Sequence, residues 1–588
     1  MLASWQVFNL LAISILLMWN LQARAISSPK PTTKYWVFFT DKGTKCDSDQ
    51  ARLSRIAQAQ LSQRAITRRL KVRSPENLID FTDLPVCADY VAQVRALGLS
   101  PIVISKWLNA ISVRATDAQI RQLAALPFVH QIQPVAVFRD KSDSLQAYDL
   151  TKPRIDSPGA QNHQLDYGPS YTQNAVINVP KVHDAGVDGS GVLVAMLDTG
   201  FRYRQHEAFQ KLNVVAEYDF IHQDEVTANQ TNQDVSAQDS HGTATLSVIG
   251  GFMPGQLIGV AYGASFLLAK TEIYESELRI EEDNWVAGIE WAEELGADVV
   301  SSSLGYAYFD NGFSYSFDDL DGKTAVTTIA ANLAVSKGVV VVNAVGNNDS
   351  KWHHNIWTPA DGFDVIAVGA ISADSLLAPF SCKGPTADGR IKPEVVALGV
   401  NVFAATPHYY SAKTKYAYFN GTSLSCPAVA GVCALILSAH PELTPQQVRE
   451  ALLNTASRAT NPDSVGGYGW GVVDAYEAVT YFGEPQKKTV EVKDWKLYPP
   501  YPNPFIVSRD FYTTIEFDVN DDTAVAIKIY NILGQPVANL LKRTFLRGRK
   551  IAIWTGVDNN GRPVASGVYF CRLQIDGHHQ TKRIVLFR

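Results

Sequence analysis

Residues 420–427 read Asn-Gly-Thr-Ser-Leu-Ser-Cys-Pro and open a strongly apolar segment that runs to about Ala439. This pattern predicts a long buried helix with Ser423 in its first turn. Gly421 allows a sharp backbone turn before the helix, and the free N–H groups of a helix start stabilise negative charge beside the hydroxyl. The stretch suits a nucleophilic serine, although an isolated Gly-Thr-Ser is more often a simple helix cap.

Two further stretches supply the groups that a nucleophilic serine needs. Residues 194–200, Val-Ala-Met-Leu-Asp-Thr-Gly, predict a buried parallel strand with Asp198 at its carboxyl end, and residues 239–243 place His241 at the start of an apolar helix. A hydroxyl becomes a good nucleophile only when a base removes its proton and a third group orients that base. We therefore expect Asp198, His241 and Ser423 to form a catalytic triad. Their chain order differs from that of chymotrypsin-like enzymes and of hydrolases with a G-x-S-x-G elbow.

The motifs DTG, HGT and GTS-x-x-x-P closely resemble those of the subtilisin-like serine proteases, over about residues 174–482. The resemblance implies peptide-bond hydrolysis through an acyl-enzyme, with no organic cofactor. One departure is Ala244, where many members of the family carry a second histidine. Because that position lies outside the triad, the assignment is unaffected.

The resemblance extends to the groups around the scissile bond. Asn347 follows a buried valine-rich strand, and its matching asparagine in the family donates to the oxyanion together with the backbone N–H of the nucleophile. A role for Asn347 in a local turn is the alternative. Other matching residues pair with the substrate backbone and form the walls of the pocket for the residue before the cut; these are Ser303, Leu304, Gly305 and Gly346. The sequence does not indicate what fills that pocket.

Valine-rich strands alternate with helices through this part of the chain, which predicts an α/β fold with a parallel sheet covered by helices on both faces. The expected strands are residues 192–197, 214–220, 265–271, 298–303, 339–344 and 365–371, and the expected helices are 243–250, 285–295 and 325–336.

The chain has 588 residues, of which 46% are apolar and 19% charged, so several globular units are expected. Residues 1–25 contain an apolar run followed by Ala-Arg-Ala and are predicted to be a secretory signal peptide, with an uncleaved anchor as the alternative. Elsewhere the sequence contains no run of 18 apolar residues, so we expect no membrane span in the mature chain.

Residues 26–139 predict a small α+β domain with strands at 34–39 and 130–138, a hairpin at 102–113 and helices at 51–69, 90–97 and 118–126. Its position resembles that of the inhibitory propeptides of subtilisin-like enzymes. It carries 16 Lys and Arg against 8 Asp and Glu, a net charge of +8, whereas the whole chain has −6. Opposite charges favour association of this domain with the rest of the chain, although a merely solvated basic face is the alternative. No nucleic-acid-binding motif accompanies the basic residues, so no nucleic-acid partner is expected.

Residues 140–173 are polar and are predicted to be a linker that contains the maturation site. Among the six cysteines, Cys426 and Cys433 lie too far apart along one helix to form a disulfide and are expected to be packed thiols, whereas Cys46 and Cys87 could form one. The acidic loop 318–322 could bind calcium or could simply be solvated.

A second polar linker, residues 483–497, precedes a predicted β-sandwich at 498–588. YPNPF, IYNILGQPV and the ending KRIVL resemble the C-terminal sorting domain of proteins exported by the type IX secretion system; a generic immunoglobulin-like module is the alternative. We therefore expect a bacterial serine endopeptidase, made as a zymogen and secreted or displayed at the cell surface. Its expected partners are protein or peptide substrates, its own propeptide and the secretion machinery. An exopeptidase and a catalytically silent binding protein remain the alternatives.

Overall fold

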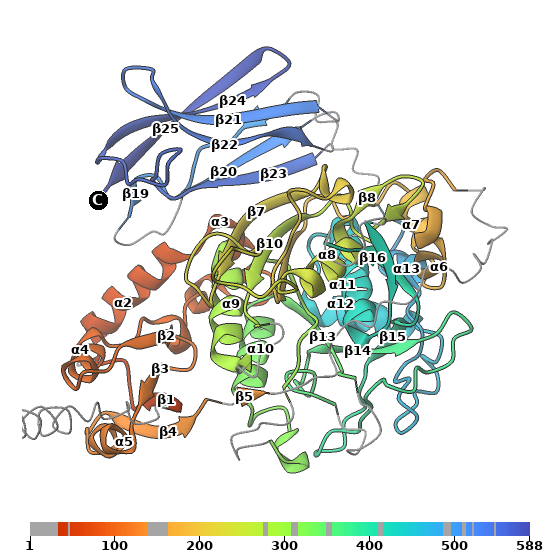
Figure 1. Cartoon of the computed structure of the whole chain (residues 1–588), viewed down its shortest axis with the longest axis horizontal. Coiled ribbons are helices and arrows are strands. Elements are labelled where there is room, and N and C mark those ends of the chain that lie inside the picture. The colour runs from red at the N-terminus through yellow and green to blue at the C-terminus, as the bar shows by residue number, and fades with distance from the viewer. Residues whose placement is uncertain are drawn as a thin grey trace, which may run out of the picture.

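Figure 1 shows the computed structural model of the chain, which consists of three units. The structure describes residues 33–44, 47–135, 137–138, 163–273, 280–306, 315–347, 356–407, 415–485, 495–507, 513–519, 523–545 and 548–588. The predicted signal peptide, Cys46 and most of the predicted linker 140–173 lie outside these ranges. Cys87 is a free thiol.

The central unit is built on a seven-stranded parallel sheet in the order β15-β14-β13-β12-β6-β10-β7. Its strands are β6 (Leu193–Asp198), β7 (Asn213–Asp219), β10 (Ser265–Lys270), β12 (Val299–Ser302), β13 (Val340–Ala344), β14 (Ile366–Ile371) and β15 (Val395–Leu398). Every residue of β6 and β10 is buried, as expected of strands covered on both faces. The predicted fold class is confirmed.

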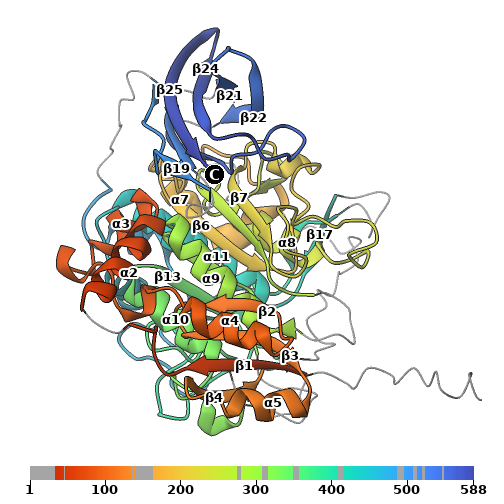
Figure 2. The same ribbon diagram turned by 90° about the vertical axis from the view of Figure 1, so that its left-hand side faces the viewer.

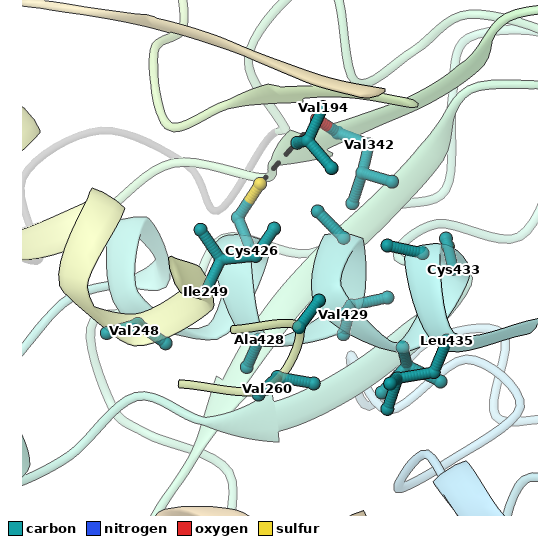
Figure 3. Packing of buried hydrophobic residues seen from close by; sticks show 14 of the residues in the cluster. Val194, Val248, Ile249, Val260, Val342, Cys426, Ala428, Val429, Cys433 and Leu435 are labelled. Atoms are coloured by element: carbon teal, nitrogen blue, oxygen red, sulfur yellow. Dashed lines mark hydrogen bonds between the residues drawn. The ribbon is translucent and has the colours of Figure 1, made fainter. Parts of the chain in front are cut away.

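Helices pack on each face of this sheet. On one face lie α8 (Ser240–Gly250) and α11 (Thr422–Ala439), and on the other lie α9 (Glu282–Leu295) and α10 (Val326–Ser336) (Figure 1). Figure 3 shows Cys426 and Cys433 of α11 packed among apolar side chains; both are buried free thiols, as the sequence predicts. Burial raises the pKa of Cys426 to about 12, which keeps this thiol protonated and unreactive.

The helix α11 is the one described helix that is long and apolar enough to cross a membrane, and 89% of its apolar window is buried within the protein. The same unit contains elements that the sequence does not predict: α6 (Tyr171–Ala175), α7 (Val179–Asp184), β16 (Val402–Ala405), β17 (Tyr416–Phe419), α12 (Pro445–Thr455) and α13 (Ala475–Thr480). Residues 163–173, expected in the linker, pack on this unit. Gln173 Nε2, for example, donates to Phe403 O (3.1 Å).

The N-terminal unit is an antiparallel sheet in the order β2-β3-β1-β4, formed by β1 (Thr33–Phe39), β2 (Pro101–Ser105), β3 (Ala110–Ala115) and β4 (Val129–Pro134). The helices α4 (Ala88–Ala96) and α5 (Asp117–Ala124) contribute to a small core on one face of this sheet. The opposite face, with Trp36 and Trp107, joins the core of α9 and α10 (Figure 2).

The single helix expected at 51–69 is instead two helices, α2 (Asp47–Gln60) and α3 (Gln63–Arg69). Ser62 has an extended backbone, and its hydroxyl accepts a hydrogen bond from Ala65 N (3.0 Å). The Ser62 N–H donates to Glu294 O of α9 (3.0 Å). The helix is therefore interrupted because the N-terminal unit bonds to the central unit at this point.

The C-terminal unit is a β-sandwich with a three-stranded sheet, β18-β20-β23, and a five-stranded sheet, β19-β25-β24-β21-β22. Its strands are β18 (Lys496–Leu497), β19 (Phe505–Ile506), β20 (Thr513–Val519), β21 (Thr523–Asn531), β22 (Pro536–Phe545), β23 (Gly548–Trp554), β24 (Gly567–Ile575) and β25 (His578–Phe587). It has its own core and touches the central unit beside β7, where Lys550 Nζ donates to Gly263 O (3.4 Å).

Candidate active site

The predicted catalytic side chains converge at the carboxyl edge of the sheet. The strands β6, β12 and β13 are neighbours there, and their register pairs Leu197 with Ser302 and Ser302 with Asn343. Asp198 ends β6, and Ser303 directly follows β12. Parallel sheets bind ligands at this edge because all strands deliver their ends to it.

Asp198 and His241 form a direct pair. His241 Nδ1 lies 2.6 Å from Asp198 Oδ1, and both side chains are buried. Gly242 allows this approach, because a Cβ at that position would lie 2.2 Å from Gly200 O and 3.1 Å from Asp198 Cβ. The pair fixes the imidazole with Nδ1 toward the carboxylate, which leaves Nε2 as the nitrogen that can take a proton from a nucleophile.

Two threonines that the sequence analysis does not identify hold the Asp198 carboxylate. Thr245 Oγ1 donates to Asp198 Oδ2 (2.9 Å), and Thr199 N donates to Oδ1 (2.7 Å). Each carboxylate oxygen thus accepts a hydrogen bond besides the one to the imidazole, so the orientation of the carboxylate is fixed. Thr245 lies on α8 one turn after His241, and that spacing is the signal in the sequence that could identify it.

Ser423 lies in the first turn of α11, directly after Gly421 and Thr422. Gly421 has φ 150°, a conformation that other residues rarely adopt. Ser423 and Ser303 bond reciprocally: Ser303 Oγ donates to Ser423 O (2.9 Å), and Ser423 Oγ donates to Ser303 O (3.4 Å). The helix start is therefore attached to the end of β12, one strand away from Asp198.

Asn347 lies beside the same helix start. Its Oδ1 accepts hydrogen bonds from Thr422 N (2.8 Å) and Thr422 Oγ1 (3.0 Å). These two donors fix the carbonyl oxygen of the amide against Thr422, the residue before Ser423. Thr422 is thus a positioning residue for Asn347, and only its place between Gly421 and Ser423 marks it in the sequence.

A strand of the N-terminal unit reaches this edge of the sheet. The short strand β5 (Val137–Phe138) pairs antiparallel with β11 (Ile280–Glu281), which directly precedes α9. In the first turn of α9, Trp285 Nε1 donates to Ser302 Oγ at the end of β12 (3.0 Å). Residues 130–138, expected as one strand, are thus divided between the small sheet and this extended pairing beside the site.

Elsewhere in the described ranges, Asp219, His222 and Asp234 lie close enough together to bind a metal ion. Lys270 Nζ lies 2.7 Å from Asp219 Oδ2 and 2.5 Å from Asp234 Oδ1, so an ammonium already supplies the positive charge there. In the loop 318–322, Asp321 Oδ1 accepts hydrogen bonds from Lys323 N and Thr324 N (2.9 Å each). Calcium binding by this loop stays a prediction.

A cavity of about 1140 Å³ lies where the three units meet, and it contains none of the predicted site residues. Its lining includes Lys106 of the N-terminal unit, Glu217 and Trp291 of the central unit, and Leu541 of the sandwich. The chemistry therefore belongs to the sheet edge and not to this junction.

A buried Asp–His pair and a serine at a helix start, both at the carboxyl edge of a parallel sheet, are the arrangement expected of a serine hydrolase. The profile of the Subtilase family matches residues 189–471. Subtilisin E of Bacillus subtilis (strain 168) is 32% identical over 305 residues, which cover 51% of this chain and 69% of the relative. Subtilisin DY of Bacillus licheniformis is 33% identical over 304 residues, which cover 52% and 96%. The chain belongs to the subtilase family and is a serine endopeptidase.

The other two units also match known domains. Residues 34–148 match the Peptidase S8 propeptide domain of Bacteroidota, and residues 500–586 match the secretion system C-terminal sorting domain. The solved structure of fervidolysin from Fervidobacterium pennivorans, a keratinolytic enzyme related to subtilisin, covers 92% of this chain and 70% of that one, with a TM-score of 0.53 and 20% identity. The protein is thus made as a zymogen and exported to the cell surface or beyond it.

Proposed function

We propose that Ser423 attacks the scissile carbonyl while His241 removes its proton and later delivers it to the leaving amine. Asp198 orients His241 and stabilises its cation. Asn347 and the backbone N–H of Ser423 donate to the oxyanion of the tetrahedral intermediate. The observation that carries this proposal is the 2.6 Å pair between His241 and Asp198 at the sheet edge where α11 begins.

Residues 303–305 are proposed to bind the substrate backbone in an extended conformation. The pairing of β5 with β11 supports this, because an antiparallel strand already pairs at the start of α9, close to the end of β12. The products of an intact protein substrate, read by mass spectrometry, test the proposal. Internal fragments are expected at the earliest times, whereas stepwise loss of terminal residues would identify an exopeptidase.

The N-terminal unit is proposed to be the inhibitor of the site. Cations of this unit pair with the acidic residues on and just after α9: Lys34 with Asp283 (2.6 Å), Arg69 with Glu293 (2.7 Å), and also Arg68 with Glu293, Lys106 with Glu294, and Arg64 with Asp298. This arrangement agrees with the opposite charges of the two parts.

The most deeply buried of these contacts is the one to Glu293. Arg69 Nε and Nη2 donate to the two carboxylate oxygens of Glu293 at 2.8 and 2.7 Å. Arg68 Nη1 donates to Ala297 O just beyond the end of α9 (2.7 Å). Burial alone would raise the pKa of Glu293, but the charges of Arg69 and Arg68 hold it at about 2. The carboxylate is therefore ionised in the complex and depends on these partners.

Replacing Arg69 with alanine should weaken inhibition by the cleaved propeptide by about 100-fold or more, because breaking a buried ion pair costs about 3–5 kcal/mol. The measurement is the dilution at which the processed, still associated complex becomes active. Arg52→Ala, on an exposed position of α2, is the matched control. Glu293→Gln tests the same contact without altering the propeptide, and release of both variants at the wild-type dilution would contradict the proposal.

The C-terminal unit is proposed to engage the secretion machinery. Because the sandwich has its own core, deletion of residues 493–588 should leave kcat per active site unchanged while abolishing delivery to the cell surface. Cell-surface and culture-medium fractions of the native host provide the readout. Normal surface delivery of the truncated chain would disprove the sorting role. The proposed functions of the three units need no nucleic-acid partner and no organic cofactor.

A further inference from the structure

Two segments near Ser423 carry the residues expected to form the walls of the pocket for the residue before the cut. One wall is formed by residues 303–306 after β12, and the other by residues 344–347 after β13. Asn343 Nδ2 donates to Leu304 O (2.9 Å) and so ties the two walls together. Since Ser303 bonds to Ser423, the first wall begins at the proposed nucleophile.

Residues 356–358 bond to both walls. Trp357 N donates to Val345 O (3.0 Å) on one side. On the other side, Tyr306 and Thr358 exchange two backbone hydrogen bonds, of 2.9 and 3.0 Å. The backbone of this segment is thus bonded to each wall. These hydrogen bonds fix the position of the Trp357 backbone, from which the indole projects.

The Trp357 side chain occupies the space between the two glycines of the walls. A Cβ placed on Gly346 would lie 2.3 Å from Trp357 Cδ2 and 2.6 Å from Cγ, so the indole lies directly on that glycine. A Cβ placed on Gly305 would lie 2.9 Å from Trp357 Cβ and 3.0 Å from Cε3. Trp357 is 5% exposed. The room that two glycines create is therefore already taken by the indole.

We propose that Trp357 restricts the pocket for the residue before the cut to small side chains, so that the enzyme cleaves after alanine, glycine or serine. This inference rests on the proposed function of Ser423 and adds the substrate class. A large aromatic or branched substrate side chain would have to displace an indole that contacts both walls. Such a displacement is energetically costly because the site is close-packed. A methyl or hydroxymethyl group needs no such displacement.

Peptide p-nitroanilides that differ only in the residue before the anilide, Ala, Leu or Phe, test the proposal. The wild-type enzyme should have its highest kcat/KM with Ala. Trp357→Gly should raise kcat/KM for Phe relative to Ala by about 100-fold, since single groups in an apolar pocket change this ratio by about 10- to 200-fold. Trp357→Leu should raise the same ratio by a smaller factor. It provides the test if the Trp357→Gly variant does not fold. Trp291→Gly, on α9 where the ring meets Phe220 (5.9 Å between centroids), is the matched control and should keep the Ala preference.

The proposal is overturned if the wild-type enzyme cleaves the Phe substrate as well as the Ala substrate, or if neither Trp357 variant changes the ratio. Labelling by a fluorophosphonate separates this failure from failure of the catalytic assignment. A variant that is labelled at Ser423 but keeps the wild-type preference disproves only the role of Trp357. A wild-type enzyme with no label at Ser423 disproves the catalytic assignment and, with it, the role of Trp357.

Discussion

Replacing Ser423 with alanine is expected to lower kcat by about 10⁶-fold, the loss typical of a triad that has lost its nucleophile. If the enzyme removes its own propeptide, the Ser423→Ala chain should also accumulate as a folded species that still carries residues from about Ile26. The Asp198–His241 pair remains in this variant, but without a hydroxyl it has no proton to move. The N-terminal sequence of the purified protein and its turnover of a peptide substrate are the measurements.

Ser425→Ala is a suitable control for Ser423→Ala. Ser425 is buried in the same helix turn, and its hydroxyl donates to Thr422 O (2.9 Å). It should be processed normally, with at most a small loss of stability. Appearance of the mature N-terminus in a Ser423→Ala preparation free of other proteases would contradict self-processing.

Replacing Asn347 with leucine should lower kcat by about 10²–10³-fold, or roughly 2.7–4 kcal/mol, and should change KM far less. The substitution keeps a similar volume and removes the amide that we propose donates to the developing oxyanion. Because the ground-state carbonyl needs this donor little, the loss falls on the chemical step. The number of active sites, titrated by a burst assay, gives kcat per folded molecule.

Thr422→Val separates the catalytic role of Asn347 from a structural one. It removes the hydroxyl that donates to Asn347 Oδ1 and keeps the backbone donor. We expect an intermediate loss of kcat with a melting temperature close to that of the wild type. An unchanged kcat per active site in Asn347→Leu, with a lowered melting temperature, would show that Asn347 only shapes the turn.

The long, uniformly buried elements could be predicted from the sequence because their patterns are local. The strands that carry Asp198 and precede Asn347 consist mainly of apolar residues, and α11 is apolar over most of its length. The four-residue strand β15 has the same composition, but Pro393 and Gly399 flank it closely and the run is short. Such a strand is stabilised by its neighbour β14 and carries little local signal.

Features that depend on contacts between distant parts of the chain could not be predicted. The break between α2 and α3 occurs because Ser62 bonds to α9 of another unit. The position of Trp357 against Gly305 joins residues 52 positions apart, and only the fold brings them together. In the sequence, Gly305 and Gly346 indicate room for a substrate side chain. In the structure, the Trp357 indole occupies the space beside these two glycines.

The most direct test of the catalytic assignment is covalent labelling of the mature enzyme by a fluorophosphonate, with the modified residue located by mass spectrometry. We expect one adduct per chain, on Ser423, and a much slower reaction in His241→Ala because the base that activates the hydroxyl is absent. An adduct on any other serine, or no adduct on a folded and processed chain, would contradict it.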